Sequence, residues 1–158
     1  ERARLAGIPG EVVARKAYPD GQAFDVALLE GLEGAEPDVI VLAGFLCVLG
    51  KAIIQRYPQQ IINVHPSLIP SFCGNGFYGL RVHQAALDYG VKVTGATVHF
   101  VNEITDGGKI ILQKAVGIDA GDTPESLQKK VMEQAEWKIL PEAVRLFCEG
   151  KLDLERSR

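Results

Sequence analysis

Two short apolar, β-prone runs separated by a helical stretch constrain the fold of this chain most. The runs occupy residues 38–42 and 61–65, and residues 50–57 between them have the length of a short helix. Continuous apolar strands are typical of parallel sheets that are covered on both faces. Strand, helix, strand is the unit from which such sheets are built. The pattern therefore predicts an α/β fold with a mostly parallel sheet and helices on both faces.

The remaining segments add further helices and strands to this plan. Asp20 precedes a helix that places Phe24 and Leu28 on one face, and Thr123 with Pro124 has the residue types of a helix start. That last helix should bury Leu127, Val131, Ala135 and Leu140, be kinked or interrupted at Pro141 and end near Gly150. A helix is also expected over residues 81–89, and strands are expected over residues 11–14, 93–101 and 109–116.

Composition limits the classes of function. With 158 residues and 47% apolar composition, residues 1–158 should form a single domain with a sizeable core. A net charge of −3 leaves no basic excess for nucleic acid, so no nucleic-acid partner is expected. The longest apolar stretch, residues 39–49, is too short to span a bilayer, so no membrane association is expected. Three cysteines without CxxC spacing, and no signal peptide, favour the cytoplasm.

The first residues are typical of the end of a helix, not of the start of a protein. The sequence opens at Glu1 without an initiator Met, and residues 1–9 are typical of the last turns of a helix that Gly7 and Pro9 end. We therefore expect a segment upstream of Glu1 to be missing.

Asn63 and His65 are the strongest candidates for a functional site. They lie two residues apart in a strand, so their side chains should point to the same face, roughly 7 Å apart. Pro66 ends the strand, and open α/β sheets build their sites at the carboxyl ends of strands. Asp106, followed by two glycines, adds a carboxylate on a loop flexible enough to approach the pair. A hydrogen-bond donor, a titratable base and a carboxylate together predict a catalytic site.

Simpler interpretations stand beside these. Asp106 on its own is also explained as a turn residue. His83, among polar residues of a helix, is expected to be solvated, and His99 is expected to be a satisfied core or rim residue. Cys47 is best interpreted as a small hydrophobic residue, and Glu136 on residue type alone as an exposed carboxylate.

Four segments together resemble one known family. They are residues 37–45 (PDVIVLAGF), 63–70 (NVHPSLIP), 95–103 (GATVHFVNE) and 106–108 (DGG). In this combination the chain resembles the phosphoribosylglycinamide formyltransferases, folate-dependent enzymes of purine synthesis. The resemblance covers essentially the whole chain. It implies a Rossmann-like formyltransferase fold that lacks the family's first βαβ segment, because the glycine-rich phosphate loop of that segment would precede Glu1.

The resemblance also implies a reaction. A formyl group would move from 10-formyltetrahydrofolate, as co-substrate, to the amine of glycinamide ribonucleotide, with Asn63, His65 and Asp106 as the catalytic residues. The amide of Asn63 and an N–H of His65 suit the stabilisation of an oxyanion, and Asp106 would orient His65 or a water that carries the proton. Whether His65 acts as base or as donor is left open by the sequence. The implied partners are small molecules, without a metal, and the protein would be a monomer or homodimer.

The resemblance assigns binding residues as well. The pterin pocket would be lined by Phe45, Leu46, Val48, Leu49, Val101, Asn102, Glu103, Ile104 and Thr105, and the nucleotide would contact Pro66 and Glu136. Two further departures from the family pattern are Cys47, where an Arg is usual, and a longer loop over residues 71–79.

Three alternatives remain at this point. Formyltetrahydrofolate hydrolases share the Asn, His and Asp but usually have a second His after the catalytic one, where this chain has Pro66. Methionyl-tRNA formyltransferases usually carry an Arg-Gly-Ala-Ala-Pro stretch that is absent here. The third alternative is a folate-binding module that has lost its chemistry together with the upstream segment.

Overall fold

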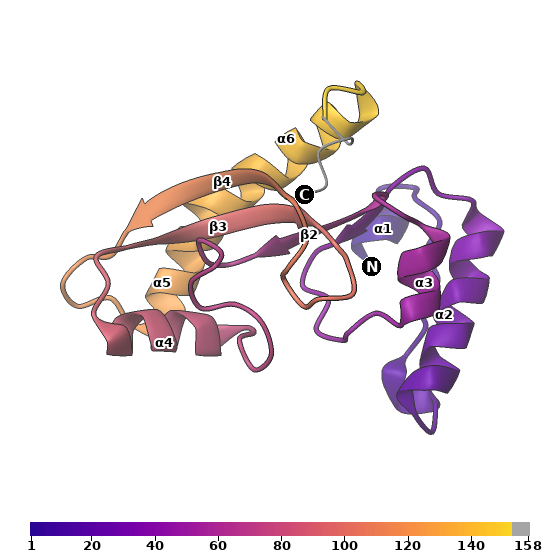
Figure 1. Ribbon diagram of the computed structural model, residues 1–158, viewed down its shortest axis with the longest axis horizontal. Coiled ribbons are helices and arrows are strands. Elements are labelled where there is room, and N and C mark those ends of the chain that lie inside the picture. Colours follow the sequence, from indigo (N-terminus) through magenta and orange to yellow (C-terminus); the bar gives the residue numbers. More distant parts are fainter. Residues whose placement is uncertain (153–158) are drawn as a thin grey trace.

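The computed structural model describes residues 1–152 and arranges four strands and their helices around one sheet (Figure 1). In chain order the elements are α1 (Arg2–Leu5), a 3₁₀ turn (Arg15–Ala17), α2 (Gly21–Ala35), β1 (Ile40–Leu42), α3 (Lys51–Arg56), β2 (Ile61–His65), α4 (Leu80–Tyr89), β3 (Val93–Phe100), β4 (Ile110–Gly117), α5 (Pro124–Val131), a π-helical turn (Met132–Glu136) and α6 (Trp137–Cys148). No helix within these residues is long and apolar enough to cross a membrane.

The sheet confirms the α/β architecture but is mixed, which corrects the expectation of a mostly parallel sheet. Its order is β1-β2-β3-β4; β1 runs parallel to β2, whereas β2–β3 and β3–β4 are antiparallel. The β3–β4 connection is a short loop, which can only join antiparallel strands. Helix α4 follows β2 and packs against α5 beyond the end of that strand (Figure 1). The next strand, β3, therefore runs back in the direction opposite to β2.

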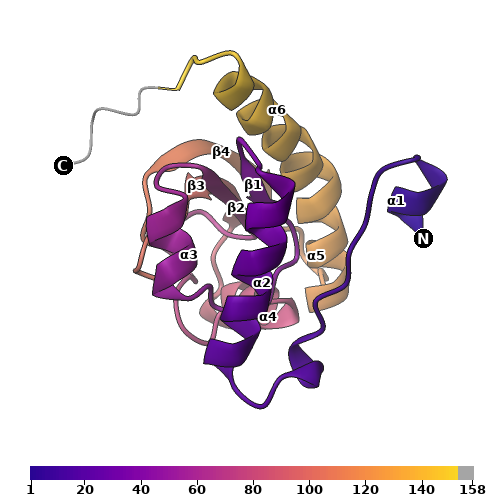
Figure 2. The ribbon, with the colours of Figure 1, turned by 90° about the vertical axis from the view of Figure 1, so that its right-hand side faces the viewer.

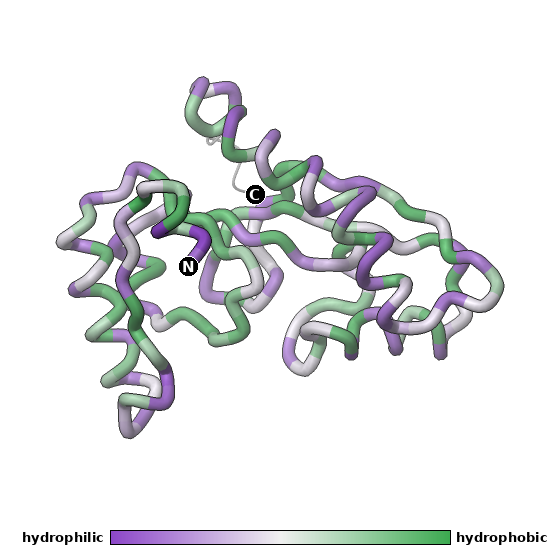
Figure 3. The backbone as a smooth tube through the Cα atoms, turned by 180° about the vertical axis from the view of Figure 1, so that it is seen from behind, coloured by the Kyte–Doolittle hydropathy of each residue, from purple (hydrophilic) through white to green (hydrophobic). Residues whose placement is uncertain are grey.

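Helices cover both faces of this sheet (Figure 2). Neighbouring strand residues point to opposite faces, and Ile61 and Ile62 are both fully buried. Ile62 packs in the cluster that includes Leu127 and Val131 of α5, whereas Ile61 packs with Ile53 of α3 and with α2. Burying each such isoleucine contributes about 1.5–3 kcal/mol. The helices alternate hydrophobic and hydrophilic residues, as expected for elements with one buried stripe (Figure 3).

Local signals placed most element boundaries correctly. The Asp20 side chain accepts a hydrogen bond from the Ala23 N–H at 2.8 Å, and Thr123 forms a capping box with Ser126. The strand expected at residues 11–14 is wrong: that segment pairs with none of the described strands, and Val12 is 89% exposed. The apolar run after residue 38 forms a strand only at Ile40–Leu42, which pairs with β2 alone among the described strands, and Val41 is 38% exposed.

The irregularity expected at Pro141 lies upstream of it. Helix α6 continues through Pro141. Pro141 has no N–H and cannot donate to the carbonyl of Trp137, four residues before it. The π-helical turn ends at Glu136, just before Trp137. An α-helix has 3.6 residues per turn, so a stripe with strict i+4 spacing drifts around it. The wider π turn offsets this drift. The core stripe is therefore Leu127, Val131, Ala135, Ile139 and Ala143. The predicted member Leu140 is partly buried against this core and also borders a pocket, with Gln128, Met132 and Glu136.

Candidate active site

The pairing of β2 with β3 brings four polar side chains to one face of the sheet. Asn63 is the register partner of His99, and His65 is the register partner of Thr97. Directly opposed residues in an antiparallel pair lie on the same face. The β3–β4 register shifts between Val98 and His99, where Ile111 is an extra residue of β4, and irregularities of this kind are common beside functional sites.

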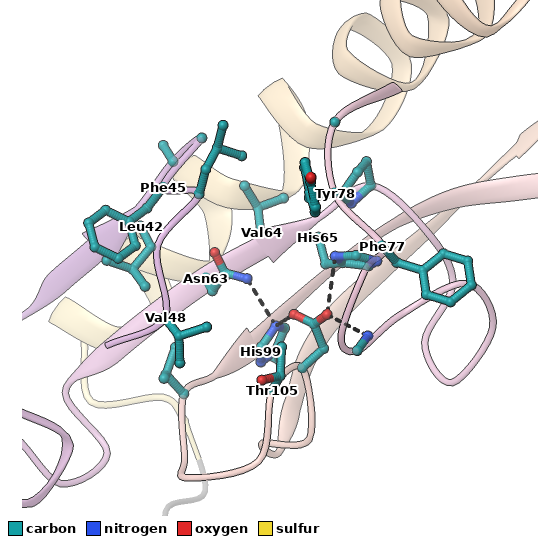
Figure 4. Close-up of a pocket in the computed structure, with 18 of the residues that line it drawn as sticks. Leu42, Phe45, Val48, Asn63, Val64, His65, Phe77, Tyr78, His99 and Thr105 are labelled. Atoms are coloured by element: carbon teal, nitrogen blue, oxygen red, sulfur yellow. Dashed lines mark hydrogen bonds and ion pairs between the residues drawn. The ribbon is translucent and has the colours of Figure 1, made fainter. Parts of the chain in front are cut away.

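Asn63 points toward His99 in this group (Figure 4), and Asp106 contacts both histidines. Its Oδ2 is 3.5 Å from Nδ1 of His65, and its Oδ1 is 3.6 Å from Nε2 of His99. The backbone N–H of Gly74 donates to Oδ2 at 2.8 Å. Burial opposes ionisation of Asp106, but the contacts with His99, the Gly74 N–H and His65 outweigh burial and hold its pKa below the ordinary value. The structure thus brings Asn63, His65 and Asp106 together, as the sequence predicted.

The two histidines are oriented by backbone carbonyls. Nε2–H of His65 donates to the carbonyl of Phe72 at 2.9 Å, and Nδ1–H of His99 donates to that of Phe100 at 2.8 Å, because a carbonyl can only accept. The second nitrogen of each ring therefore faces the Asp106 carboxylate. Two lone pairs facing a carboxylate repel it, so a proton held between Asp106 and one imidazole stabilises the group. The arrangement can hold and release a proton.

The loop that carries Asp106 passes close to neighbouring atoms at both of its glycines. A Cβ on Gly108 would lie 1.7 Å from the Phe100 carbonyl oxygen, and one on Gly107 would lie 2.6 Å from Cγ2 of Ile104. Asp106 itself has a φ of 54°, a conformation that Asp tolerates better than most residues. This close approach at Gly108 places the carboxylate of Asp106 beside the two histidines.

A cavity of about 1000 Å³ opens beside these residues. It is lined by every site residue named from the sequence, namely Asn63, His65, Asp106, Phe45, Leu46, Val48, Leu49, Val101, Asn102, Glu103, Ile104, Thr105, Pro66 and Glu136. Leu46, Val48 and Ile104 are 71%, 72% and 68% exposed, although all three are apolar and border the same cavity. Exposed apolar side chains around one cavity mark a ligand-binding surface.

Glu136 lies on the cavity wall formed by the long C-terminal helices. It is half-buried, which corrects the interpretation as an exposed carboxylate, and burial raises the pKa of its carboxyl group above the ordinary value. The π turn that ends at Glu136 keeps it in line with Met132 on the cavity side. A half-buried carboxylate at a cavity wall can accept hydrogen bonds from hydroxyl groups of a ligand.

Two further histidines belong to the candidate site. The expectation that His99 is a satisfied core or rim residue is confirmed, but the sequence did not place it in the site, and the expectation for His83 is wrong. His99 is only 2% exposed and contacts both Asn63 and Asp106; its place depends on the β2–β3 register, which no local pattern reveals. His83 was expected to be solvated but is 1% exposed and lines the cavity. Burial, and then the nearby His65, lower the pKa of His83 to about 4. The signal available for His83 was its spacing from Ala86 and Leu87, which is that of a buried helix face.

Other chemistries find less support in the described part of the chain. Within residues 1–152, no group of three or more His, Cys, Asp or Glu side chains is arranged to hold a metal ion. No lysine or arginine of that range lines the cavity. The cavity therefore combines apolar walls with a proton-holding group, and recognition there depends on shape and hydrogen bonds.

Comparison with known proteins gives one consistent result. Residues 1–144 match the family model described as formyl transferase. The chain is 36% identical over 157 residues to the phosphoribosylglycinamide formyltransferase of Escherichia coli (strain K12), covering 99% of this chain and 71% of that protein. It is 44% identical over 154 residues to the trifunctional purine biosynthetic protein adenosine-3 of Bos taurus, covering 98% of this chain but only 15% of that protein.

A solved structure extends the agreement to three dimensions. The crystal structure of glycinamide ribonucleotide transformylase 1 from Symbiobacterium toebii superposes with a TM-score of 0.89 at 43% identity, covering 98% of this chain and 70% of that one. The mixed sheet described above is thus an arrangement that a solved structure shares.

Proposed function

Because this chain belongs to the formyl transferase family, we propose that it transfers a formyl group from 10-formyltetrahydrofolate to the amine of glycinamide ribonucleotide, a step of purine synthesis. The observation that carries the proposal is a group of polar side chains at the wall of a cavity of about 1000 Å³, in which Asp106 contacts His65 and His99 and Asn63 contacts His99. The proteins similar to it from E. coli and S. toebii bear names of this activity.

The geometry suits acyl transfer to an amine. When the amine attacks the formyl carbon, the carbonyl oxygen becomes an oxyanion, and the amide of Asn63 stands at the cavity wall as a donor for it. Such a donor typically contributes about 10²–10³ in rate. The amine must also lose a proton and the folate nitrogen must gain one. Asp106, 3.5 Å from His65, orients the ring and takes part in that proton transfer.

The folate portion of the cavity is assigned to two segments. Phe45, Leu46, Val48 and Leu49 come from the loop after β1, and residues 101–105 come from the loop after β3; both border the cavity. A flat heterocycle needs an apolar slot with a few hydrogen-bonding groups. The high exposure of Leu46, Val48 and Ile104 supports this assignment, because a bound pterin would cover them.

The nucleotide portion is assigned to Pro66 and Glu136. Both border the cavity, and Glu136 presents a half-buried carboxylate from the C-terminal helices. We assign Glu136 to the ribose hydroxyls, which donate the hydrogen bonds that a carboxylate accepts. Both partners of the reaction are then small molecules. The three cysteines are free, which suits the reducing cytoplasm as the place of the reaction.

A direct assay tests the function. The protein is mixed with 10-formyltetrahydrofolate and, in separate arms, with glycinamide ribonucleotide, methionyl-tRNA or water alone, and release of tetrahydrofolate is followed. We expect rapid release only with the nucleotide, and strong loss of that release in Asp106→Asn. Release of tetrahydrofolate that is independent of the nucleotide would instead identify a formyltetrahydrofolate hydrolase. Formylation of the tRNA would identify a methionyl-tRNA formyltransferase. Folate binding without release in any arm would favour a binding module.

A further inference from the structure

His83 is a buried histidine that the proposed reaction does not use. It lies in the first turns of α4, and its side chain is 1% exposed. Neither ring nitrogen has a hydrogen-bond partner among the described residues. His83 also lines the cavity of the candidate active site. No other described side chain has every polar atom both buried and unpartnered, apart from the hydroxyl of Tyr57.

Such a side chain costs stability in the free protein. A buried polar group without a partner loses its hydrogen bonds to water, a penalty of about 1–3 kcal/mol, and most buried side-chain polar atoms in native proteins are paired. An apolar residue of similar size would avoid that penalty. A histidine at this position is therefore explained better by a partner that comes from outside the protein than by packing.

The surroundings of His83 determine what kind of partner fits. The helix N-terminus of α4 carries partial positive charge, His65 is near enough to affect its titration, and burial adds to both effects. All three disfavour an imidazolium. An uncharged imidazole has one donor and one acceptor nitrogen, which suits a neutral oxygen such as a carbonyl or hydroxyl and does not supply the positive charge that an anion needs.

We propose that His83 contacts the bound acceptor substrate, with its uncharged ring in a hydrogen bond to a carbonyl or hydroxyl oxygen beside His65. The amide carbonyl of the acceptor is an oxygen of this kind next to the reacting amine, so the contact would hold the amine in line for attack. This inference rests on the proposed function for the identity of the substrate. The unpaired nitrogens, the burial and the cavity position are independent of it.

Opposite effects on stability and activity would distinguish this role from a structural one. His83→Phe and His83→Leu remove the unpaired nitrogens, so we expect melting temperatures equal to or above that of the wild-type protein. For both variants we expect kcat/KM for the nucleotide to fall about tenfold while KM for the folate stays within twofold. His83→Gln, which keeps a donor and an acceptor, should recover part of the loss. Gln84→Ala, on the exposed side of α4, is the control and should leave both quantities unchanged.

A spectroscopic measurement tests the contact without turnover. In protein labelled with ¹⁵N-histidine, the two ring signals of His83, assigned by their loss in His83→Gln, should report the neutral ring at pH 7 and shift when glycinamide ribonucleotide is added. Absence of any shift on addition of the nucleotide would overturn the proposal. So would full kcat/KM in both apolar variants, or a lower melting temperature in both, since that would reveal a partner within the protein.

The two proposals fail in different ways. If the wild-type protein does not formylate the nucleotide, the function proposed above is wrong. If it does and the His83 variants behave like Gln84→Ala, only the inference about His83 is wrong. If the ¹⁵N signals of His83 shift when the folate alone is added to the free protein, but not when the nucleotide is added, His83 contacts the folate. That result would overturn the proposal as stated.

Discussion

Asn63 and His99 face each other across the β2–β3 pairing, and Nδ2 of Asn63 lies 3.2 Å from Nε2 of His99. Because Nδ1–H of His99 donates to the carbonyl of Phe100, the neutral ring presents Nε2 as an acceptor. One amide hydrogen of Asn63 is thereby engaged, which fixes the plane of the amide. The other hydrogen is available to the cavity that Asn63 lines, and in the proposed reaction a donor held in place in this way would stabilise the developing oxyanion without reorganising.

The first prediction concerns Asp106. Asp106→Asn keeps the size of the side chain but removes the charge that faces His65 and His99. We expect turnover to fall by about 10²–10⁴, the range for loss of a positioned acid–base group. Steady-state kinetics would measure this, with far-UV circular dichroism to check folding. Near wild-type turnover in this variant would contradict the assignment of Asp106.

A second prediction uses the half-buried Glu136. Glu136→Gln removes the acceptor charge proposed for the ribose hydroxyls, so KM for the nucleotide should rise about tenfold while KM for the folate stays within twofold. Glu133→Gln is the matched control, since Glu133 belongs to the same π turn but does not line the cavity. Equal changes in the two KM values, or equal effects of the two variants, would return Glu136 to a surface role.

The third prediction uses Trp137, the only tryptophan of the chain. Its side chain is 61% exposed and borders the cavity next to Glu136. Binding of the nucleotide there would exclude water from the indole, so we expect a blue shift of the fluorescence emission that saturates with nucleotide concentration. Trp137→Phe, which has no tryptophan, gives the background emission to subtract. An emission spectrum that stays constant at saturating nucleotide would place the nucleotide elsewhere.

The fourth prediction concerns stability at acid pH. Hydrogen bonds from Lys130 and from the Asp119 N–H lower the pKa of Asp122 from an ordinary value of 3.8 to about 2. A carboxylate whose pKa is lowered by folding contributes stability above its unfolded pKa and loses it as the pH falls through the folded value. Asp122→Asn should therefore be less stable than the wild type at pH 7, and the difference should shrink between about pH 4 and pH 2.

Urea unfolding at a series of pH values would measure this difference. Glu30→Gln, at an exposed position of α2, is the control and should follow the wild-type curve. If wild type and Asp122→Asn differ in free energy of unfolding by the same amount at pH 2 and pH 7, the stability that Asp122 contributes does not depend on its ionisation.

Patterns within one strand predicted the core of the site, and pairings between strands supplied the rest. Asn63 and His65 could be placed on one face because side-chain alternation is local. His99 could not, because its position depends on which residue of β3 pairs with Asn63, and that register is set by the tertiary structure. For the same reason the sequence predicted strand–helix–strand units correctly and the strand directions only in part.

Short apolar segments were the other source of error. The strand expected at residues 11–14 had the right residue types but found no neighbour in the sheet, and β propensity depends on such a neighbour. His83 was misplaced because the polar residues beside it in sequence, Arg81 and Gln84, lie on the exposed side of the same helix. The capping residues Asp20 and Thr123, whose hydrogen bonds are local, were placed correctly.

The last prediction tests whether packing of the loop positions Asp106. A Cβ on Gly108 would lie 1.7 Å from the Phe100 carbonyl oxygen, and its nearest neighbours are all backbone atoms of Phe100 and Val101, which cannot turn aside as a side chain can. Gly108→Ala should therefore displace the loop between β3 and β4 and with it the carboxylate of Asp106, two residues away. We expect turnover to fall by at least tenfold, and the free energy of unfolding to fall by about 1–3 kcal/mol, as in other overpacked sites.

Gly117→Ala is the matched control for this substitution. Gly117 ends the strand that follows the loop, and a Cβ there would meet no atom within 4 Å. The control should keep wild-type turnover and stability, because it adds the same methyl group without a collision. If Gly108→Ala also keeps wild-type turnover, the loop can move while the reaction proceeds, and the packing around Asp106 does not set its position.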